Sequence, residues 1–197
     1  YHVVTGSNVN DTTVLDGFTI SGGNANGVTE QGQGGGMRIF ISSADIILSN
    51  ITFSSNSANI GGGLYSIFSN PTLMNVNFYG NIGGLNGCGG GMYVASSNPT
   101  ISDATFAGNS ASLGGGMCSF STSLPILTNV TFDGNTATNH GGGMYNNNSI
   151  PTLVNVTFSG NIAISLGGAI YNDNNNSFIP TLTNFTIFEN TRPFAHR

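Results

Sequence analysis

Large apolar residues return along this chain at an interval of 25 to 28 residues, each time in the same local setting. One column directly follows a block of small residues, mostly Gly-Gly-Gly, and consists of Met37, Leu64, Met92, Met117, Met144 and Ile170. A second column is a phenylalanine with asparagine three residues later, at Phe53, Phe78, Phe106, Phe132 and Phe158. A third is Leu or Ile five residues before each phenylalanine, from Leu48 to Leu153. A fixed period in this range is typical of a solenoid.

The segment 152–158 shows how one repeat folds. Val156 and Phe158 are two residues apart, which predicts a strand with Thr157 pointing outward. Leu153 lies three residues before Val156, so the alternation breaks between them and predicts a corner at Asn155. Asparagine tolerates the left-handed backbone of a sharp corner, and its amide can bond to the copies above and below. The recurring corner residues therefore predict an asparagine ladder, at Asn50, Asn75, Asp103, Asn129, Asn155 and Asn184.

Each period predicts three short strands: one around the glycine block and its apolar residue, one around Thr-Leu and one around Val-Thr-Phe. Strands this short pair with their counterparts one coil along, about 4.8 Å away. We therefore expect an all-β, right-handed parallel β-helix of six to seven coils of 25–29 residues, the hand being that of most parallel crossovers. An antiparallel sandwich is the main rival, but it does not require three columns in register. The expected organisation is a single domain, 1–197, with an irregular first coil (1–33), regular coils (34–190) and a tail (191–197).

Charge is scarce in this chain. It has three Arg and eight acidic residues, and its net charge is −5. No basic groove can form, which excludes a nucleic-acid partner. No stretch approaches 18 uninterrupted apolar residues, so no transmembrane segment is expected. The chain starts at Tyr1 in strand-like sequence, with no signal peptide and no capping helix recognisable, and we expect a processed or partial chain.

Cys88 and Cys118 are the two cysteines. Cys88 lies directly before one glycine block, and Cys118 lies four residues past the start of the next. If both positions belong to straight strands, they are offset by about 16 Å at about 3.3 Å per residue, too far for a disulfide. The expectation is two unbridged thiols.

The combination of Gly-Gly-Ala-Ile at 167–170, or Gly-Gly-Gly-Met elsewhere, with Phe-x-x-Asn resembles the repeat of the polymorphic outer-membrane proteins. The passenger regions of that family are adhesive β-helices of autotransporters. The segment 14–24, Val-Leu-Asp-Gly-Phe-Thr-Ile-Ser-Gly-Gly-Asn, is similar to secreted bacterial β-helix proteins, many of them anchored at the cell surface. The resemblance implies a surface location. The chain departs from the adhesin pattern by preferring Gly to Ala at the third glycine position.

No catalytic, cofactor or metal site is expected. A β-helix hydrolase needs two or three carboxylates that converge on one face, whereas the acidic residues here fall at different levels of the repeat. His2, His140 and His196 lack metal-ligand spacing. We therefore expect no enzyme, no cofactor and no metal.

Two sets of residues are candidates for contact or modification. Tyr65, Tyr93, Tyr145 and Tyr171 recur one residue after the Met column, so alternation predicts an outward stripe that either stiffens the sheet or contacts a partner. Asn147 and Asn175 begin Asn-x-Ser sequons in expected loops and are candidate glycosylation sites.

The function that these features favour is a non-catalytic extracellular β-solenoid, acting as a cell-surface, adhesive or matrix module. Its expected partners are glycans, a host or neighbouring-cell surface, or copies of itself. A subunit of a head-to-tail filament and a polysaccharide lyase or hydrolase are the alternatives. The loops before the glycine blocks vary most, from four residues before Gly61 to seven before Gly89, and that edge is the first place to look for a binding surface.

Overall fold

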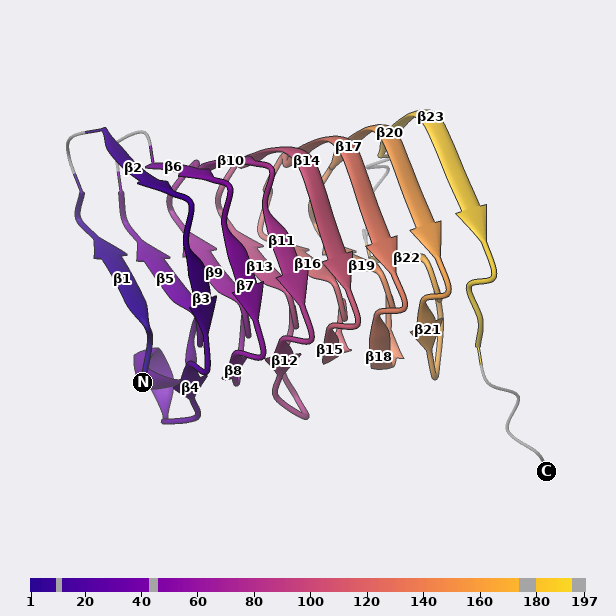
Figure 1. Cartoon of the computed structure of the whole chain (residues 1–197). Helices are drawn as coiled ribbons and strands as arrows, with labels where there is room; N and C mark the ends of the chain where they lie inside the picture. The colour runs from indigo at the N-terminus through magenta and orange to yellow at the C-terminus, as the bar shows by residue number, and fades with distance from the viewer. Residues whose placement is uncertain (10–11, 43–45, 174–179, 193–197) are drawn as a thin grey trace.

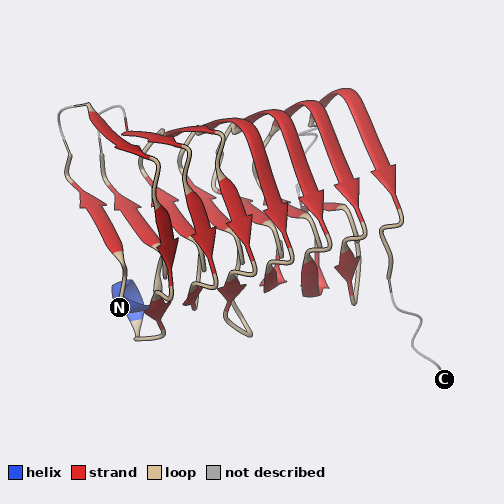
Figure 2. Cartoon of the chain, in the orientation of Figure 1, coloured by secondary structure: helices blue, strands red, loops and turns tan. Residues whose placement is uncertain are grey.

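The computed structural model describes residues 1–9, 12–42, 46–173 and 180–192. Its strands form three parallel sheets that wind as a β-helix (Figures 1 and 2). Five coils have a neighbour on both sides, slightly fewer than the six to seven counted from the sequence, because the first and last coils form the ends of the stack. The expected fold class is confirmed.

Sheet A contains the strands that follow the glycine blocks, and it lies behind sheet B in Figure 1. Its members are β1 (Val4–Ser7), β5 (Met37–Phe40), β9 (Leu64–Ile67), β13 (Met92–Ala95), β16 (Met117–Phe120), β19 (Met144–Asn147) and β22 (Ile170–Asp173). Each Met-column residue pairs with the next, as Met92 does with Met117. The predicted register of this column is therefore confirmed.

Sheet B contains both the Thr-Leu and the Val-Thr-Phe segments. In the first coils they are separate strands, namely β2 (Thr13–Asp16), β3 (Thr19–Ser21), β6 (Ile46–Ser49), β7 (Thr52–Ser54), β10 (Thr72–Met74) and β11 (Asn77–Tyr79). In later coils they join into β14 (Thr100–Ala107), β17 (Ile126–Asp133), β20 (Thr152–Ser159) and β23 (Thr181–Phe188). The predicted corner persists inside the long strands, since Asn155 keeps a left-handed backbone with φ +54°.

Sheet C was not predicted. Its strands follow the Phe-x-x-Asn motif and are β4 (Asn24–Ala25), β8 (Ser57–Ala58), β12 (Ile82–Gly83), β15 (Ser110–Leu113), β18 (Thr136–His140) and β21 (Ile162–Ala163). They lie along the lower edge in Figure 1, and a short 3₁₀ helix, η1 (Thr29–Gly32), lies in the first coil on the same side. The predicted number of three strands per coil holds for the later coils, whereas the first coils contain four because the two segments of sheet B are separate there. The assignment was wrong because two predicted strands share sheet B and one expected loop contains sheet C.

Stacked side chains fill the interior. Neighbouring phenylalanine rings from Phe53 to Phe158 lie 4.5 to 4.9 Å apart between centroids and are within 8° of parallel. All five rings are fully buried. Such stacking adds about 0.5–1.5 kcal/mol per pair to the effect of burial. The predicted phenylalanine column is thus the centre of the core.

The asparagines of Phe-x-x-Asn form an inner ladder that is also fully buried, with Asn56, Asn81, Asn109, Asn135 and Asn161 as members. The Asn109 side-chain nitrogen donates to Asn135 Oδ1 at 3.0 Å and to the Phe78 carbonyl at 2.9 Å. The Asn109 backbone nitrogen donates to the same Asn135 oxygen at 3.0 Å. Because each buried amide is satisfied by the coils on either side, the ladder sets the register between coils.

The corner asparagines form a second ladder, on the outside. Asn155 Nδ2 donates to Asn129 Oδ1 at 2.6 Å, and Asn184 Nδ2 donates to Asn155 Oδ1 at 3.0 Å. These residues are solvent-exposed. The predicted corner ladder is confirmed, and it faces water.

Candidate functional site

Each glycine block is a turn that folds the chain back across the outer side of sheet A. Gly61, the first glycine of its block, has φ +65°, and a Cβ there would lie 2.7 Å from the Leu64 carbonyl oxygen. Only glycine tolerates both this backbone and this approach. The turn therefore places the residue before each block over the outward-facing side chain that comes directly after the Met-column residue. In the first regular coil, Arg38 Nε accordingly donates to Gln33 Oε1 at 3.3 Å.

The tyrosine column lies beneath this fold-back. Tyr65 and Tyr145 are only 5% and 4% exposed, and Tyr93 and Tyr171 are half-buried. Tyr65 stacks on Tyr93 at 5.2 Å, and Tyr145 stacks on Tyr171 at 5.8 Å. The four tyrosines do point away from the solenoid interior, but they do not form an open contact stripe. The stacked rings fit the alternative of a ladder that stiffens the sheet. The alternative of a contact face treated the residue before the glycine block as part of a straight strand.

A second, smaller apolar cluster results, outside sheet A. Cys88, Cys118 and Tyr145 are its buried members, and Tyr93 and Phe120 pack against it. His140, the residue before its own glycine block, stacks on Tyr171 at 4.5 Å. We call this set of residues the outer aromatic layer.

Burial changes the acid–base chemistry of the tyrosines. Loss of solvation raises the pKa of Tyr93 to about 12, and the neighbouring Tyr65 phenol adds to the effect. Desolvation likewise raises the pKa of Tyr145 to about 12, aided by the hydrogen bond that its hydroxyl donates to Asp173 Oδ2 at 2.8 Å. These phenols are therefore neutral at physiological pH and unsuited to act as bases.

Cys88 and Cys118 are joined in a disulfide, which corrects the expectation of two free thiols. Their Cα atoms are 5.7 Å apart. The turn at Gly89, with φ +73°, moves Cys88 off the line of the strand and over the outward face, where Cys118 pairs with Tyr93. The offset of about 16 Å expected from the sequence was therefore wrong, because the two cysteines do not lie along straight strands.

The two candidate glycosylation residues lie in different settings. Asn147 is in β19 and not in a loop, and its side-chain nitrogen donates to Asp173 Oδ2 at 3.1 Å. Asn175 lies outside the described residues. Glycosylation at both residues stays a prediction.

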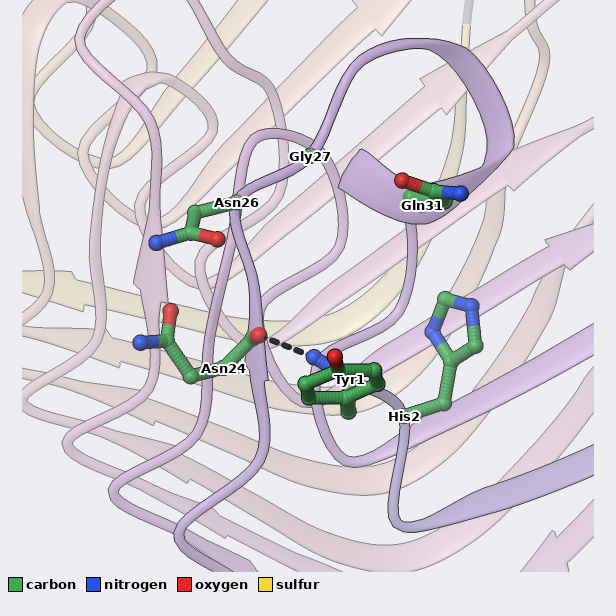
Figure 3. A pocket seen from close by; sticks show the side chains of 6 residues that line it. All are labelled: Tyr1, His2, Asn24, Asn26, Gly27 and Gln31. Atoms are coloured by element: carbon green, nitrogen blue, oxygen red, sulfur yellow. Dashed lines mark hydrogen bonds between the residues drawn. The ribbon is translucent and has the colours of Figure 1, made fainter.

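Two cavities lie on the loops of the first three coils. A cavity of about 510 Å³ is lined by Tyr1, His2, Asn24, Asn26, Gly27 and Gln31 (Figure 3). In this view Gln31 projects from η1, and the Tyr1 amino group donates to the Asn24 carbonyl. A second cavity, of about 550 Å³, is lined by Asn59, Ile60, Gly84, Leu85, Asn86 and Gly87. We call residues 24–33, 59–60 and 84–88 together the loop platform.

Asn59 connects the segments of the loop platform. Its side-chain nitrogen donates to the Gly27 carbonyl at 2.9 Å, and its own carbonyl accepts from Gly84 N at 3.1 Å. The turn that follows is closed by a hydrogen bond of 2.8 Å from Gly87 N to the Gly84 carbonyl. The disulfide at Cys88 then fixes the end of this loop. The loop platform is therefore held by bonds on several sides although it lies at the surface.

Two large apolar side chains stand out from this fixed frame. Leu85 is 89% exposed and Val28 is 78% exposed. Leu85 also lines the second cavity, where an apolar group is accessible to a partner. Variable loop length points to this edge in the sequence. Leu85, Val28 and Asn59 have no such signal, because a single residue in a loop belongs to no periodic column.

Reaction chemistry has little support within the described parts of the chain. No group of three or more His, Cys, Asp or Glu side chains that could hold a metal ion occurs among the described residues. The Arg38 guanidinium, 3.4 Å from the Glu30 carboxylate, is also placed over the Phe40 ring at 4.6 Å. The described part of the chain includes no helix with the length and apolar character needed to cross a membrane.

Comparison with known proteins adds one finding. Residues 155–173, which include β21 and the glycine block before β22, match the Chlamydia polymorphic membrane protein (Chlamydia_PMP) repeat. Neither the curated proteins nor the solved structures include a match. The repeat and the solenoid together fit a surface-exposed bacterial module. The chain is thus a parallel β-helix repeat protein, and its residues 155–173 are similar to the polymorphic membrane protein repeat.

Proposed function

We propose that this chain is a non-catalytic surface module that makes adhesive contacts through its loop platform. The observation that carries the proposal is Leu85, a large apolar side chain left 89% exposed in a loop that is fixed by hydrogen bonds and a neighbouring disulfide. A contact group held in place before binding loses little conformational freedom on association. Leu85 also lines the second cavity, which is open to a partner.

An extracellular location is supported independently by the disulfide. Disulfides form and persist in oxidising environments such as the periplasm and the cell surface. Cys118 is fully buried and Cys88 nearly so, which makes the bond part of the packed structure. A stable bond of this type favours export over residence in a reducing cytoplasm.

The proposal is tested with beads that carry the purified chain, applied to cultured epithelial cells and to a panel of immobilised extracellular-matrix proteins. We expect the wild type to adhere and Leu85→Ser to lose most of that adhesion. Leu124→Ser is the matched control, because Leu124 is 48% exposed and lies outside the loop platform. Equal adhesion of the Leu85 and Leu124 variants would contradict the proposal.

Catalysis is tested on the same preparation. The purified chain is incubated with polygalacturonate, alginate and neutral glucans, and the release of reducing ends or unsaturated products is followed. The proposal expects no turnover. Product formation that a variant of an acidic residue abolishes would favour the polysaccharide lyase or hydrolase instead.

A further inference from the structure

The outer surface of sheet B carries a regular polar strip that the loop platform does not include. Thr105, Thr131 and Thr157 pair directly across β14, β17 and β20, and Thr186 continues the row on β23. Their neighbours on both sides along each strand point into the core; Val130 and Phe132, for example, are buried. The threonines therefore face outward at about 4.8 Å from coil to coil.

The corner ladder runs beside this row, two residues earlier in each coil. Asn129 Nδ2 donates to Asp103 Oδ1 at 3.0 Å, and Asn155 Nδ2 donates to Asn129 Oδ1 at 2.6 Å. Each of these amide nitrogens uses one N–H along the axis and retains a second donor. We call the threonine row and the corner ladder of the last four coils the polar strip: Asp103, Asn129, Asn155 and Asn184 with Thr105, Thr131, Thr157 and Thr186.

The threonine hydroxyls are free to bind a ligand. None of the hydrogen bonds made within the described part of the chain uses the side chain of Thr105, Thr131 or Thr157. The coils of Thr131 and Thr157 thus offer one hydroxyl and one amide at the same relative position, and the coil of Thr105 offers a hydroxyl and the Asp103 carboxylate. This is a one-dimensional array of donors and acceptors with a fixed repeat.

Charge selects the class of ligand. On the polar strip the one charged group is the Asp103 carboxylate, and Asp133 lies two residues beyond Thr131 on β17. Arg38 is only 5% exposed and lies on sheet A, so it cannot neutralise an anion bound here. Acidic or sulfated glycans are therefore repelled, and a neutral ligand rich in hydroxyl groups fits the strip best.

We infer that the polar strip binds a linear neutral polysaccharide that lies along the solenoid axis, with one sugar residue for each coil. The sugar rings of such a chain recur at an interval close to the spacing of the strands. Successive rings of a β-1,4-linked chain face opposite ways, so the same sugar hydroxyl groups meet the strip at every second coil. Each contact is weak alone, but several in series along one rigid ligand raise the affinity. This inference rests on the proposed role as a surface contact module, and it adds a second site on a different sheet.

The test is retention of the purified chain on insoluble cellulose, chitin and mannan, with soluble neutral oligosaccharides as competitors. We expect wild-type protein to be retained by at least one of these polymers. The double variant Thr131→Val with Thr157→Val should bind at least tenfold more weakly, since valine keeps the β-branched shape and removes the hydroxyl. Thr136→Val, in sheet C, is the matched control and should bind like wild type.

Several results would overturn the inference. Retention by none of the three neutral polymers, equal retention of the double variant, or equally strong binding to alginate would each do so. If the protein inhibits ice recrystallisation and is retained on no polysaccharide, the threonine row would instead be a surface that binds ordered water. Leu85→Ser separates the two proposals, because it should abolish cell adhesion while leaving retention on the polysaccharide unchanged.

Discussion

Cys88 and Cys118 lie 30 residues apart in neighbouring coils, and a disulfide joins them across the outer aromatic layer. One sulfur precedes a glycine turn and the other follows the next turn, so the bond connects the loop platform to sheet A. The bond forms only because each glycine block folds the chain back over the outward face of that sheet.

Removal of this bond should destabilise the protein. Cys88→Ser with Cys118→Ser should lower the free energy of unfolding by about 3 kcal/mol, because a loop of this length is no longer closed in the unfolded chain. Urea unfolding followed by circular dichroism measures the change. Reductant should shift the wild type towards the double variant and leave the variant unaffected; a wild type insensitive to reductant under unfolding conditions would count against the disulfide.

The two asparagine ladders should differ in their sensitivity to mutation. Asn135→Ala removes the oxygen that accepts from both the backbone and the side-chain nitrogen of Asn109, and the amide that donates to the Phe106 carbonyl. Because these groups are buried, the change should cost about 3 kcal/mol or more. Asn129→Gly, in the exposed corner ladder, should cost less than about 1 kcal/mol, since glycine suits the left-handed corner and Gly17 already occupies it in the first coil. Similar losses of stability in the two variants would contradict this assignment of inner and outer ladders.

The third glycine of each block should be replaceable only at the end of the stack. A Cβ on Gly116 would lie 2.6 Å from the Gly143 carbonyl oxygen and 2.8 Å from Phe132 Cδ1. Gly116→Ala should therefore lower the free energy of unfolding by about 1–3 kcal/mol. Ala169 occupies the same column in the last block, and Ala169→Gly should change stability by less than about 1 kcal/mol. Thermal melts of the two variants give the comparison, and a Gly116→Ala variant as stable as wild type would refute the close packing.

Alkaline pH should destabilise the protein through the outer aromatic layer. The pKa values of Tyr93 and Tyr145 are about 12 in the folded state, above the ordinary tyrosine value of 10.0. Between these pH values the unfolded chain loses phenolic protons that the folded chain keeps, so stability falls as pH rises above about 10. Below about pH 10 both states keep these protons, and the two groups contribute no slope.

The measurement is the urea midpoint at a series of pH values, with phenolate absorbance recorded in parallel. Tyr93→Phe should flatten part of the alkaline decline, because phenylalanine has no proton to lose. A decline of unchanged steepness in this variant would show that the loss of stability has another origin.

The sequence predicts the interior much better than the surface. Phe132 and Met117 belong to columns in which one residue type recurs in register, and such columns identify the core directly. Sheet C escaped detection because its inward residues, such as Ala58, Ala111 and Ala137, are too small to produce hydrophobic alternation. These alanines are buried, but a small residue does not mark a strand in sequence.

The covering of the outer face of sheet A depends on a backbone turn that the repeat pattern does not reveal. Reading Gly89–Met92 as straight strand placed Cys88 far from Cys118 and left Tyr93 open to solvent. Positive φ at Gly89 reverses both conclusions. The variable length of the loops points to the edge where the loop platform lies, and Leu85 becomes a candidate contact residue there because of its exposure beside the fixed turn.

Hydroxyl-radical footprinting of the native protein, with oxidation quantified by mass spectrometry for each residue, tests the central claim that the tyrosine column is covered and the loop platform is the accessible surface. The account predicts rapid oxidation of Leu85 and Tyr79 and strong protection of Tyr65 and Tyr145. Oxidation of Tyr65 and Tyr145 as fast as that of Tyr79, together with protection of Leu85, would contradict it.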